Sequence, residues 1–151
     1  MKLKIKRLTD TAKLPEKNNP TDAGFDIFSD EKVFLEEGET HLVSTGIAIE
    51  IPDGYYGRLK GRSGLTSKTP LRIQEGTIDS GYRGEVKVMC EIYPLSKSIK
   101  SYDVPPRDYW IQKGDNIAQL IIQPLPEFTI EEVDSLNDTA RGEKGFGSSG
   151  I

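Results

Sequence analysis

Short runs in which apolar and polar residues alternate dominate the chain. The clearest run spans residues 85–93, where Val86, Val88, Cys90 and Ile92 fall on one face. A period of two is typical of a strand with one buried face. Comparable runs predict further strands at residues 2–8, 33–35, 42–51, 55–60, 109–112 and 128–133, and the apolar run at 117–123 predicts a fully buried strand. Apolar residues also resume at 23–28 after a polar, proline-containing loop. Turn signals separate the runs roughly every 8 to 15 residues, as in sandwiches and barrels, so we expect an all-β fold.

One stretch has helical character. Residues 63–69 form a turn or two that Pro70 stops, and Ser63 is placed to cap the free amides at its start. Such amides attract anions, and Arg62 adds a fixed guanidinium beside them. The pentapeptide at residues 61–65 therefore offers a phosphate site, although by itself it is a weak indication of function.

The densest group of chemically useful side chains lies in the loop at residues 76–86. Asp79 and Tyr82 flank a Ser-Gly dipeptide that marks a tight turn, so the segment is interpreted as a β-hairpin. Glycines at positions 76, 81 and 84 allow a positive φ or the close approach of a ligand. Asp79 and Tyr82 would then stand at the rim of a rigid sheet, as a general base and a flat stacking ring. An ordinary turn explains the same residues, since Asp and Gly are frequent there.

Composition narrows the function classes. The 151 residues fit one domain with its own core, and the net charge of −4 argues against a broad nucleic-acid surface. The single cysteine, Cys90, rules out a disulfide framework and indicates a buried thiol in a reducing compartment. No apolar run approaches the ~20 residues that span a bilayer, so we expect no membrane contact and a cytoplasmic location.

Metal chemistry is limited by the ligands available. His41 is the one histidine, and we expect it to be a surface or strand residue, which argues against a zinc site. Magnesium stays open, because it prefers oxygen ligands and often arrives on substrate phosphates.

Two polar residues in apolar surroundings have two interpretations each. Asp26 either binds backbone amides in a loop or pairs with a nearby cation. Gln119 lies within an apolar run and either satisfies backbone groups or points into a cavity. The sequence alone leaves both choices open.

Two segments fall outside the strand pattern. Residues 94–108 contain three prolines and no clear periodicity, which indicates an exposed excursion. Residues 140–151 are rich in glycine, and most such tails are disordered. Arg141 and Phe146 within this frame could instead close over an aromatic, phosphorylated ligand as a flexible lid.

Five short motifs resemble, in order, the motifs of the trimeric dUTP diphosphatases (dUTPases). They are AGFDI at residues 23–27, GRSGL at 61–65, GTIDSGYRG at 76–84, GDNIAQL at 114–120 and RGEKGFGSSG at 141–150. They cover nearly the whole chain, and five chance matches would not keep this order. The resemblance implies a single domain, a distorted jelly-roll β-barrel that assembles as a homotrimer, with each site drawing motifs from three chains.

The resemblance also implies the reaction, which is hydrolysis of dUTP to dUMP and pyrophosphate by attack of water at the α-phosphorus. This activity keeps uracil out of DNA and supplies dUMP for thymidylate synthesis. Asp79 would hold the attacking water, and Tyr82 would pack under the deoxyribose and block a 2′-hydroxyl. Backbone groups around Gly76 and Ile78 would recognise uracil.

Other motifs would bind the rest of the substrate, through Ser63, Gly64, Gln119, Gly147 and Ser148. Arg62 would be oriented through Asp26. Arg141 would reach the γ-phosphate, and Phe146 would stack on the base. Mg²⁺ would bridge the three phosphates without a direct protein ligand, with Asp26 near enough to act through water.

The chain departs from the family pattern at three places. Asn116 stands where the family usually has Arg, which removes any salt bridge made by that Arg. Lys144 replaces a frequent glycine, which reduces the expected flexibility of the tail. The excursion at residues 94–108 resembles extra segments of some bacteriophage dUTPases, where they serve protein contacts, so a protein partner is one expectation for it.

Two other functions fit parts of the pattern. The dCTP deaminases share the fold, but the resemblance places their catalytic Glu where this chain has Met89. A catalytically silent module that binds a nucleotide or a partner is the second alternative. Asp79 and the intact tail argue against it.

Overall fold

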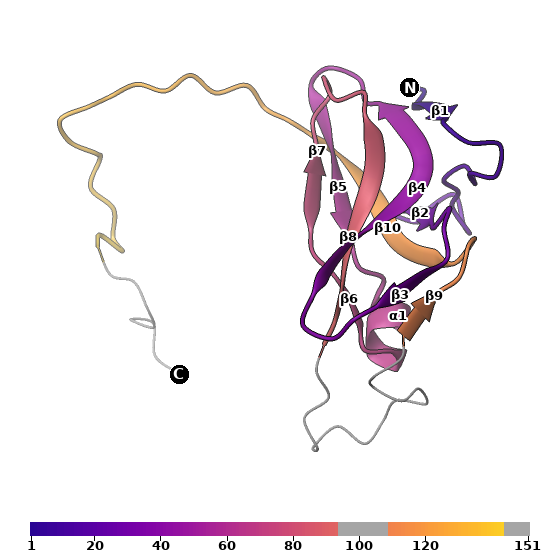
Figure 1. Cartoon of the computed structure of the whole chain (residues 1–151). Coiled ribbons are helices and arrows are strands. Elements are labelled where there is room, and N and C mark those ends of the chain that lie inside the picture. The colour runs from indigo at the N-terminus through magenta and orange to yellow at the C-terminus, as the bar shows by residue number, and fades with distance from the viewer. Residues whose placement is uncertain (94–108, 144–151) are drawn as a thin grey trace.

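The computed structural model describes residues 1–93 and 109–143 (Figure 1). Its elements in chain order are β1 (Lys4–Arg7), β2 (Phe25–Phe28), β3 (Val33–Leu35), β4 (Thr40–Glu50), β5 (Tyr55–Lys60), α1 (Ser63–Lys68), β6 (Leu71–Ile73), β7 (Gly76–Ile78), β8 (Glu85–Ile92), β9 (Tyr109–Ile111) and β10 (Asn116–Pro124). The predicted all-β fold with one short helix is confirmed.

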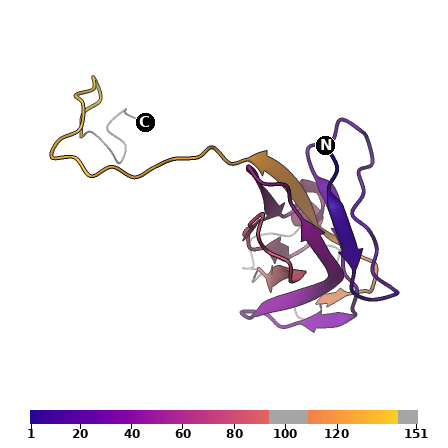
Figure 2. The same cartoon turned by 90° about the horizontal axis from the view of Figure 1, so that it is seen from above.

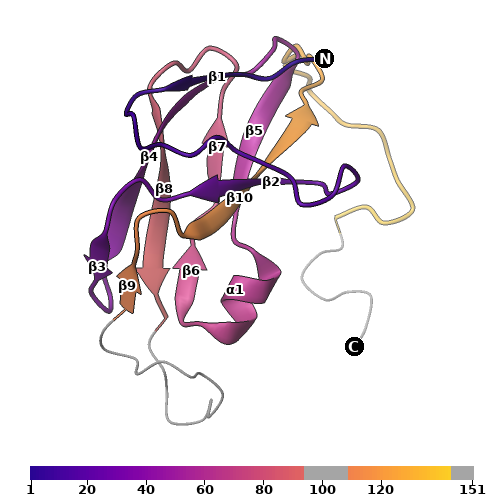
Figure 3. The ribbon, with the colours of Figure 1, turned by 90° about the vertical axis from the view of Figure 1, so that its right-hand side faces the viewer.

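Antiparallel pairing arranges these strands in two four-stranded sheets. One has the order β1-β4-β8-β6 and the other the order β2-β10-β5-β7, while β3 and β9 form a separate two-stranded ribbon. The second sheet leads directly into α1 at its lower end (Figure 3). In the described part of the chain, no strand pairing joins the two four-stranded sheets, so the expected jelly-roll barrel is not closed by hydrogen bonds.

The core is formed by one continuous cluster of apolar side chains from these sheets. The predicted alternation along β8 is confirmed, because Val86, Val88, Cys90 and Ile92 are all buried while Lys87 is exposed. Fully burying one such aliphatic side chain contributes about 1.5–3 kcal/mol. This cluster holds the strands rigid, and the loops at their ends carry the polar residues discussed below.

Cys90 is completely buried, as expected, and burial raises the pKa of its thiol to about 12. In the unfolded chain the thiol ionises near pH 9.0, so folding keeps it neutral at pH values where the unfolded chain would lose the proton. The free energy of unfolding should therefore be unaffected by Cys90 below pH 9 and should fall as the pH rises towards 12.

This prediction is checked by urea unfolding at pH 8 and at pH 10.5, with Cys90→Ala as the control. Tyrosines and lysines also titrate in this range, but they do so in both proteins, so the difference between the two isolates Cys90. The wild-type protein should lose more stability than the variant between the two pH values. An equal loss would mean that the thiol is not protected in the folded protein.

The loop at residues 76–86 is not a simple hairpin, so this part of the prediction was wrong. β6 pairs with the end of β8, but β7 leaves β8 and pairs with β5 in the opposite sheet. Before β7 turns away, the Gln74 N–H donates a backbone hydrogen bond to the Met89 carbonyl of β8, at 3.0 Å. Ile78 is 5% exposed and packs in the core, which explains why β7 crosses to the other sheet. The crossing leaves a space between β7 and β8.

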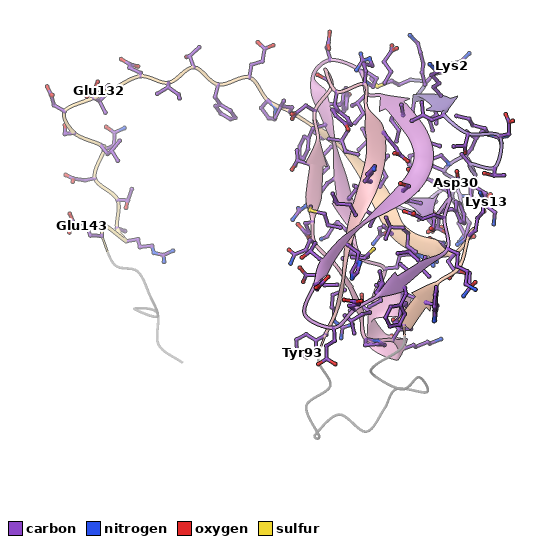
Figure 4. All side chains as sticks on the ribbon, viewed as in Figure 1. Lys2, Lys13, Asp30, Tyr93, Glu132 and Glu143 are labelled. Atoms are coloured by element: carbon purple, nitrogen blue, oxygen red, sulfur yellow. The ribbon has the colours of Figure 1, made fainter. Side chains whose placement is uncertain are left out.

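The strand expected at residues 128–133 is also wrong. After β10, residues 125–143 form an extended arm without strand pairing, which leaves the body of the molecule (Figures 1 and 2). Pro124 and Pro126 have no N–H to continue the ladder of β10. Phe128 and Ile130 are 86% and 101% exposed, so these apolar side chains pack on no sheet of residues 1–93 and 109–143. The side chains of the arm, with Glu132 and Glu143 labelled, stand clear of the sheets (Figure 4).

Candidate functional site

The first four motifs lie at two pockets, and residues 141–143, the described start of the fifth, lie on the arm. The first pocket has a volume of about 600 Å³ and lies between the loop before β2, the start of α1 and the middle of β10. Its lining residues are Asn18, Asp22, Ala23, Gly24, Asp26, Arg62, Ser63, Gly64, Leu65, Lys68, Thr69 and Gln119. Motifs one, two and four, which are far apart in the sequence, therefore meet at one place.

Asp26 and Arg62 form an ion pair at this pocket. The Arg62 Nε lies 3.2 Å from Asp26 Oδ1, and the Asp26 side chain is only 13% exposed. Asn18 Nδ2 donates to the other carboxylate oxygen of Asp26, at 3.3 Å. Of the two interpretations of Asp26, the structure supports the one in which its carboxylate pairs with a nearby cation. The ion pair holds the Arg62 guanidinium at the wall of the pocket.

Position 116 still contacts Arg62 although it lacks the usual Arg. The Arg62 Nη1 donates to the backbone carbonyl of Asn116, at 3.5 Å. A backbone carbonyl is present whatever the side chain, so this contact does not depend on the substitution. The Asn116 Oδ1 is buried and has no hydrogen-bond partner in the described part of the chain.

Gln119 fulfils both interpretations made for it. Its Nε2 donates to the Gly61 carbonyl, at 3.0 Å, which satisfies a backbone group next to motif two. The same side chain lines the first pocket. Gln119 therefore joins β10 to the turn that leads into α1.

Ser63 does not cap α1, contrary to the prediction. Arg62 occupies the N-cap position with an extended backbone, and no side chain makes a capping hydrogen bond there. Ser63 is instead the first helical residue, and it is exposed at the pocket. Its hydroxyl is therefore not used to satisfy the helix, and α1 has six residues only.

The second pocket has a volume of about 550 Å³ and opens where β7 parts from β8. Its lining residues are Leu42, Leu59, Gly76, Thr77, Ile78, Asp79, Tyr82, Glu85, Val86, Lys87 and Met89. Asp79 is exposed at its rim, and its carboxylate has no hydrogen bond or ion pair in the part of the chain that the structure describes. A carboxylate in this situation is accessible to accept a proton from a bound water.

Tyr82 is held in place by its hydroxyl, which donates to the Glu85 carbonyl at 2.9 Å. The ring crosses over Gly84, where a Cβ would overlap the Tyr82 hydroxyl and lie 2.6 Å from Cζ. Gly84 thus has no side chain because Tyr82 occupies the space. None of the three glycines in this loop has a positive φ, so that part of the expectation was wrong, while the close approach of a ligand stays a prediction.

Of the predicted site residues that the structure describes, Arg141 lines neither pocket. The two pockets have no lining residue in common. Arg141 lies on the arm, away from the sheets, and Phe146, Gly147 and Ser148 lie outside the described residues, as does Lys144.

Some lining residues were not foreseen. Lys87 and Met89 alternate with buried residues on β8, so the period of two already placed them on its outer face, although not at a pocket. Asn18 and Asp22 come from a polar loop without periodicity, and no local signal could have found them. Lys68, in the last turn of α1, adds a cation to the first pocket.

The described residues contain neither a cluster of metal-ligating side chains nor a membrane-spanning helix. Within residues 1–93 and 109–143, His, Cys, Asp and Glu side chains form no group of three that could hold a metal ion. Across the same residues, no helix is long and apolar enough to cross a membrane. The polar groups that the described residues bring to the two pockets include the free Asp79 carboxylate, the fixed Arg62 guanidinium, the Lys68 ammonium, the Ser63 hydroxyl and the Gln119 amide.

Comparison with known proteins links this arrangement to a family. The family model of dUTPase matches residues 10–150. The deoxyuridine 5′-triphosphate nucleotidohydrolase of Paramecium bursaria Chlorella virus 1 is 42% identical over 149 residues, which cover 99% of this chain and 98% of that protein.

Solved structures of two phage enzymes are similar over their whole length. A point variant of the Staphylococcus bacteriophage 80alpha dUTPase with dUpNHpp has a TM-score of 0.87 and 36% identity, and the match covers 99% of both chains. A point variant of the dUTPase from phage phi11 of S. aureus, with a structural Mg(II) ion, has a TM-score of 0.78 and 36% identity, over 89% of this chain and 98% of that chain. With its motifs gathered at two pockets and matches of this extent, the chain belongs to the dUTPase family.

Proposed function

We propose that the protein hydrolyses dUTP to dUMP and pyrophosphate, and so keeps uracil out of DNA and supplies dUMP for thymidylate synthesis. The observation that carries the proposal is the free Asp79 carboxylate at the rim of the second pocket, in a member of the dUTPase family. The bound dUpNHpp in the related phage enzyme supports a deoxyuridine triphosphate as the substrate.

The first pocket binds the triphosphate in this proposal. Arg62, fixed by Asp26, supplies a positive charge that does not have to be ordered when the substrate arrives. The Ser63 hydroxyl, the Gly64 amide and the Gln119 amide add hydrogen-bond donors around the same space. Phosphate oxygens accept several such bonds at once, which suits this wall.

The second pocket binds the nucleoside. Backbone groups of Gly76 and Ile78 recognise uracil along β7, and the Tyr82 ring lies under the deoxyribose where a 2′-hydroxyl would have to fit. Met89 lines this pocket at the position where a deaminase of the same fold would need Glu. A thioether cannot transfer protons, so deamination of dCTP is not supported.

The chemical step needs one proton acceptor. Asp79 orients a water and accepts its proton while the water oxygen bonds to the α-phosphorus. The bond from that phosphorus to the oxygen bridging the α- and β-phosphates breaks, and its electron pair leaves with pyrophosphate. Positioning and charge neutralisation provide most of the acceleration in phosphate transfer.

Mg²⁺ is the proposed cofactor. Since the described residues offer no metal cage, the ion would be held by the substrate phosphates, as is common for Mg²⁺. When bound, the ion would neutralise part of the negative charge of the substrate phosphates. Asp26 could reach it only through water, because its carboxylate is already paired with Arg62.

We also propose that the active form is a homotrimer. One chain supplies two separate pockets, and its arm carries Arg141 away from both, so neighbouring copies are needed to complete a site. The exposed apolar residues Phe128 and Ile130 fit an arm that packs on another subunit. A cytoplasmic location remains part of the proposal, as does a protein partner for residues 94–108, which lie outside the described residues.

The function is tested by product analysis with Mg²⁺ and a set of nucleoside triphosphates, including dUTP, UTP, dCTP and dTTP. We expect dUMP and pyrophosphate from dUTP and little turnover of the others. Formation of dUTP from dCTP would show a deaminase. Binding without any product would show a silent binding module.

Sugar selection gives a separate prediction about Tyr82 and Gly84. Gly84→Ala places a methyl group where the Tyr82 ring lies, so the ring must move and the wall against a 2′-hydroxyl is lost. We expect the ratio of kcat/KM for dUTP over UTP to fall, as it should in Tyr82→Ala. If Gly84→Ala retains the wild-type ratio, another wall excludes the ribose.

A further inference from the structure

Gln119 lies at the centre of the first pocket's framework. It belongs to β10, where it is opposite Asp26 of β2 on one side and Lys60 of β5 on the other. A residue paired on both sides cannot shift along or across the sheet without breaking the ladder. The direction of its Cα–Cβ bond is therefore fixed, and only its outer atoms can rotate.

The end of this side chain makes one hydrogen bond, from Nε2 to the Gly61 carbonyl, at 3.0 Å. Gly61 directly precedes Arg62 and Ser63, so the bond ties β10 to the turn that carries the second motif. The amide group has a second N–H, which has no other partner among the described residues. This N–H is available to a ligand in the pocket.

Gly24 lies against the same side chain. A Cβ at Gly24 would stand 2.8 Å from Gln119 Oε1, 3.1 Å from its Cβ and 3.4 Å from its Cδ. The φ of Gly24 is not positive, so its backbone conformation does not require glycine. The requirement is one of space, and the Gln119 Cβ cannot move away because β10 is paired on both sides.

We propose that Gly24 is a positioning residue: its bare α-carbon holds the Gln119 amide against Gly61 and leaves the second amide N–H directed at the triphosphate. We call this placement of the Gln119 amide by Gly24 the clamp. The identity of the ligand rests on the proposed function, whereas the clamp rests on the distances between Gly24, Gln119 and Gly61. The Gln119 side chain then connects motifs one, two and four. This role would explain why Gly24, which has no functional group, lines the pocket.

The first test compares two ligands in Gly24→Ala. Affinity for the triphosphate analogue dUpNHpp should fall by roughly 10-fold or more, as expected when a hydrogen bond to a charged group is lost. Affinity for dUMP, which lacks the β- and γ-phosphates, should change by less than about 3-fold. An equal loss for both ligands would overturn the proposal, because it would show a general disturbance of the pocket.

A double-mutant cycle then asks whether Gly24 acts through Gln119. Gln119→Ala removes Oε1 and Cδ, two of the three atoms that the new methyl group would meet, and with them the amide that Gly24 is proposed to position. Adding Gly24→Ala to it should therefore cost little further affinity for dUpNHpp. Equal losses in the two backgrounds would mean that Gly24 acts independently of Gln119.

Gly38→Ala is the matched control. It adds the same methyl group at an exposed turn with nothing within 4 Å, but at a φ of +87°, so it destabilises the protein through backbone strain alone. Its affinity for dUpNHpp should equal that of the wild type. A weaker affinity would show that lost stability, not the clamp, explains the result with Gly24→Ala.

One readout does not depend on nucleotide at all. In the wild-type protein one side-chain amide proton of Gln119 should exchange slowly with solvent, as measured by NMR, and in Gly24→Ala both should exchange fast. If the protein failed to bind or hydrolyse dUTP, the proposed function would fall, but this measurement would still decide the clamp. Slow exchange that persists in Gly24→Ala would refute the clamp.

Discussion

Asp79→Asn should lower kcat for dUTP by about 100-fold or more, since a positioned general base contributes typically 10²–10⁴-fold. The change keeps the size and shape of the side chain but replaces the proton acceptor with an amide. Asp79 is exposed and bonded to no other side chain in the described part of the chain, so the fold should tolerate the substitution. Affinity for dUpNHpp should stay close to that of the wild type.

Asp53→Asn provides the matched control for this prediction. Asp53 is an exposed carboxylate in the turn before β5 and lines neither pocket. The same loss of one negative charge there should leave kcat unchanged. Turnover by Asp79→Asn at the wild-type rate would place the general base at another residue.

A chain ending at Thr139 should fold and trimerise but lose nearly all of its activity. The truncation leaves every strand that the structure describes, both pockets and the apolar part of the arm intact, so the melting temperature should remain near that of the full chain. The lost residues include Arg141 and Phe146, which in our proposal neutralise the γ-phosphate and cover the base. Calorimetry, sedimentation and kcat/KM for dUTP measure the three properties separately.

Single substitutions divide this effect between the two residues. Stacking of an aromatic ring contributes only ~0.5–1.5 kcal/mol, so Phe146→Ala should be the milder change. Arg141→Ala removes a charge-assisted contact that strengthens as closure excludes water. A larger loss for Phe146→Ala would mean that covering the base matters more than charge in the closed site.

Mixing subunits tests where the tail acts. If a site combines Asp79 of one chain with the tail of another, trimers that contain both the truncated chain and Asp79→Asn should regain activity that neither parent has. Subunit exchange must first be verified, for example by mass spectrometry of the intact trimers. No recovery after verified exchange would mean that each chain closes its own site.

The strands were predictable because most of them have one buried face. Along β8 the alternation of Val86 and Val88 with polar residues already gives the register that the structure shows. The arm shows where this reasoning ends. Phe128 and Ile130 follow the same alternation but are exposed. An apolar pattern indicates that a strand needs a surface to pack on, but it does not say whether that surface belongs to the same chain.

Many of the residues that line the two pockets were predictable, whereas their arrangement was not. Asp79 and Tyr82 are separated by two residues, and their common pocket follows from the sequence. The pairing of β7 with β5 does not, since it depends on Ile78 packing in the core of the opposite sheet. The contact between Gly24 and Gln119 joins positions 95 residues apart (119 − 24), which a single sequence cannot reveal.

The most direct test of the account is hydrolysis of dUTP in water enriched in ¹⁸O, with mass analysis of both products. Attack at the α-phosphorus by the water that Asp79 holds places the label in dUMP and leaves pyrophosphate unlabelled. We predict one ¹⁸O atom per dUMP in a single turnover, and a much slower appearance of the same product with Asp79→Asn. Label in pyrophosphate would contradict the account, because it would show that water attacks the β-phosphorus. The account places the water held by Asp79 next to the α-phosphorus.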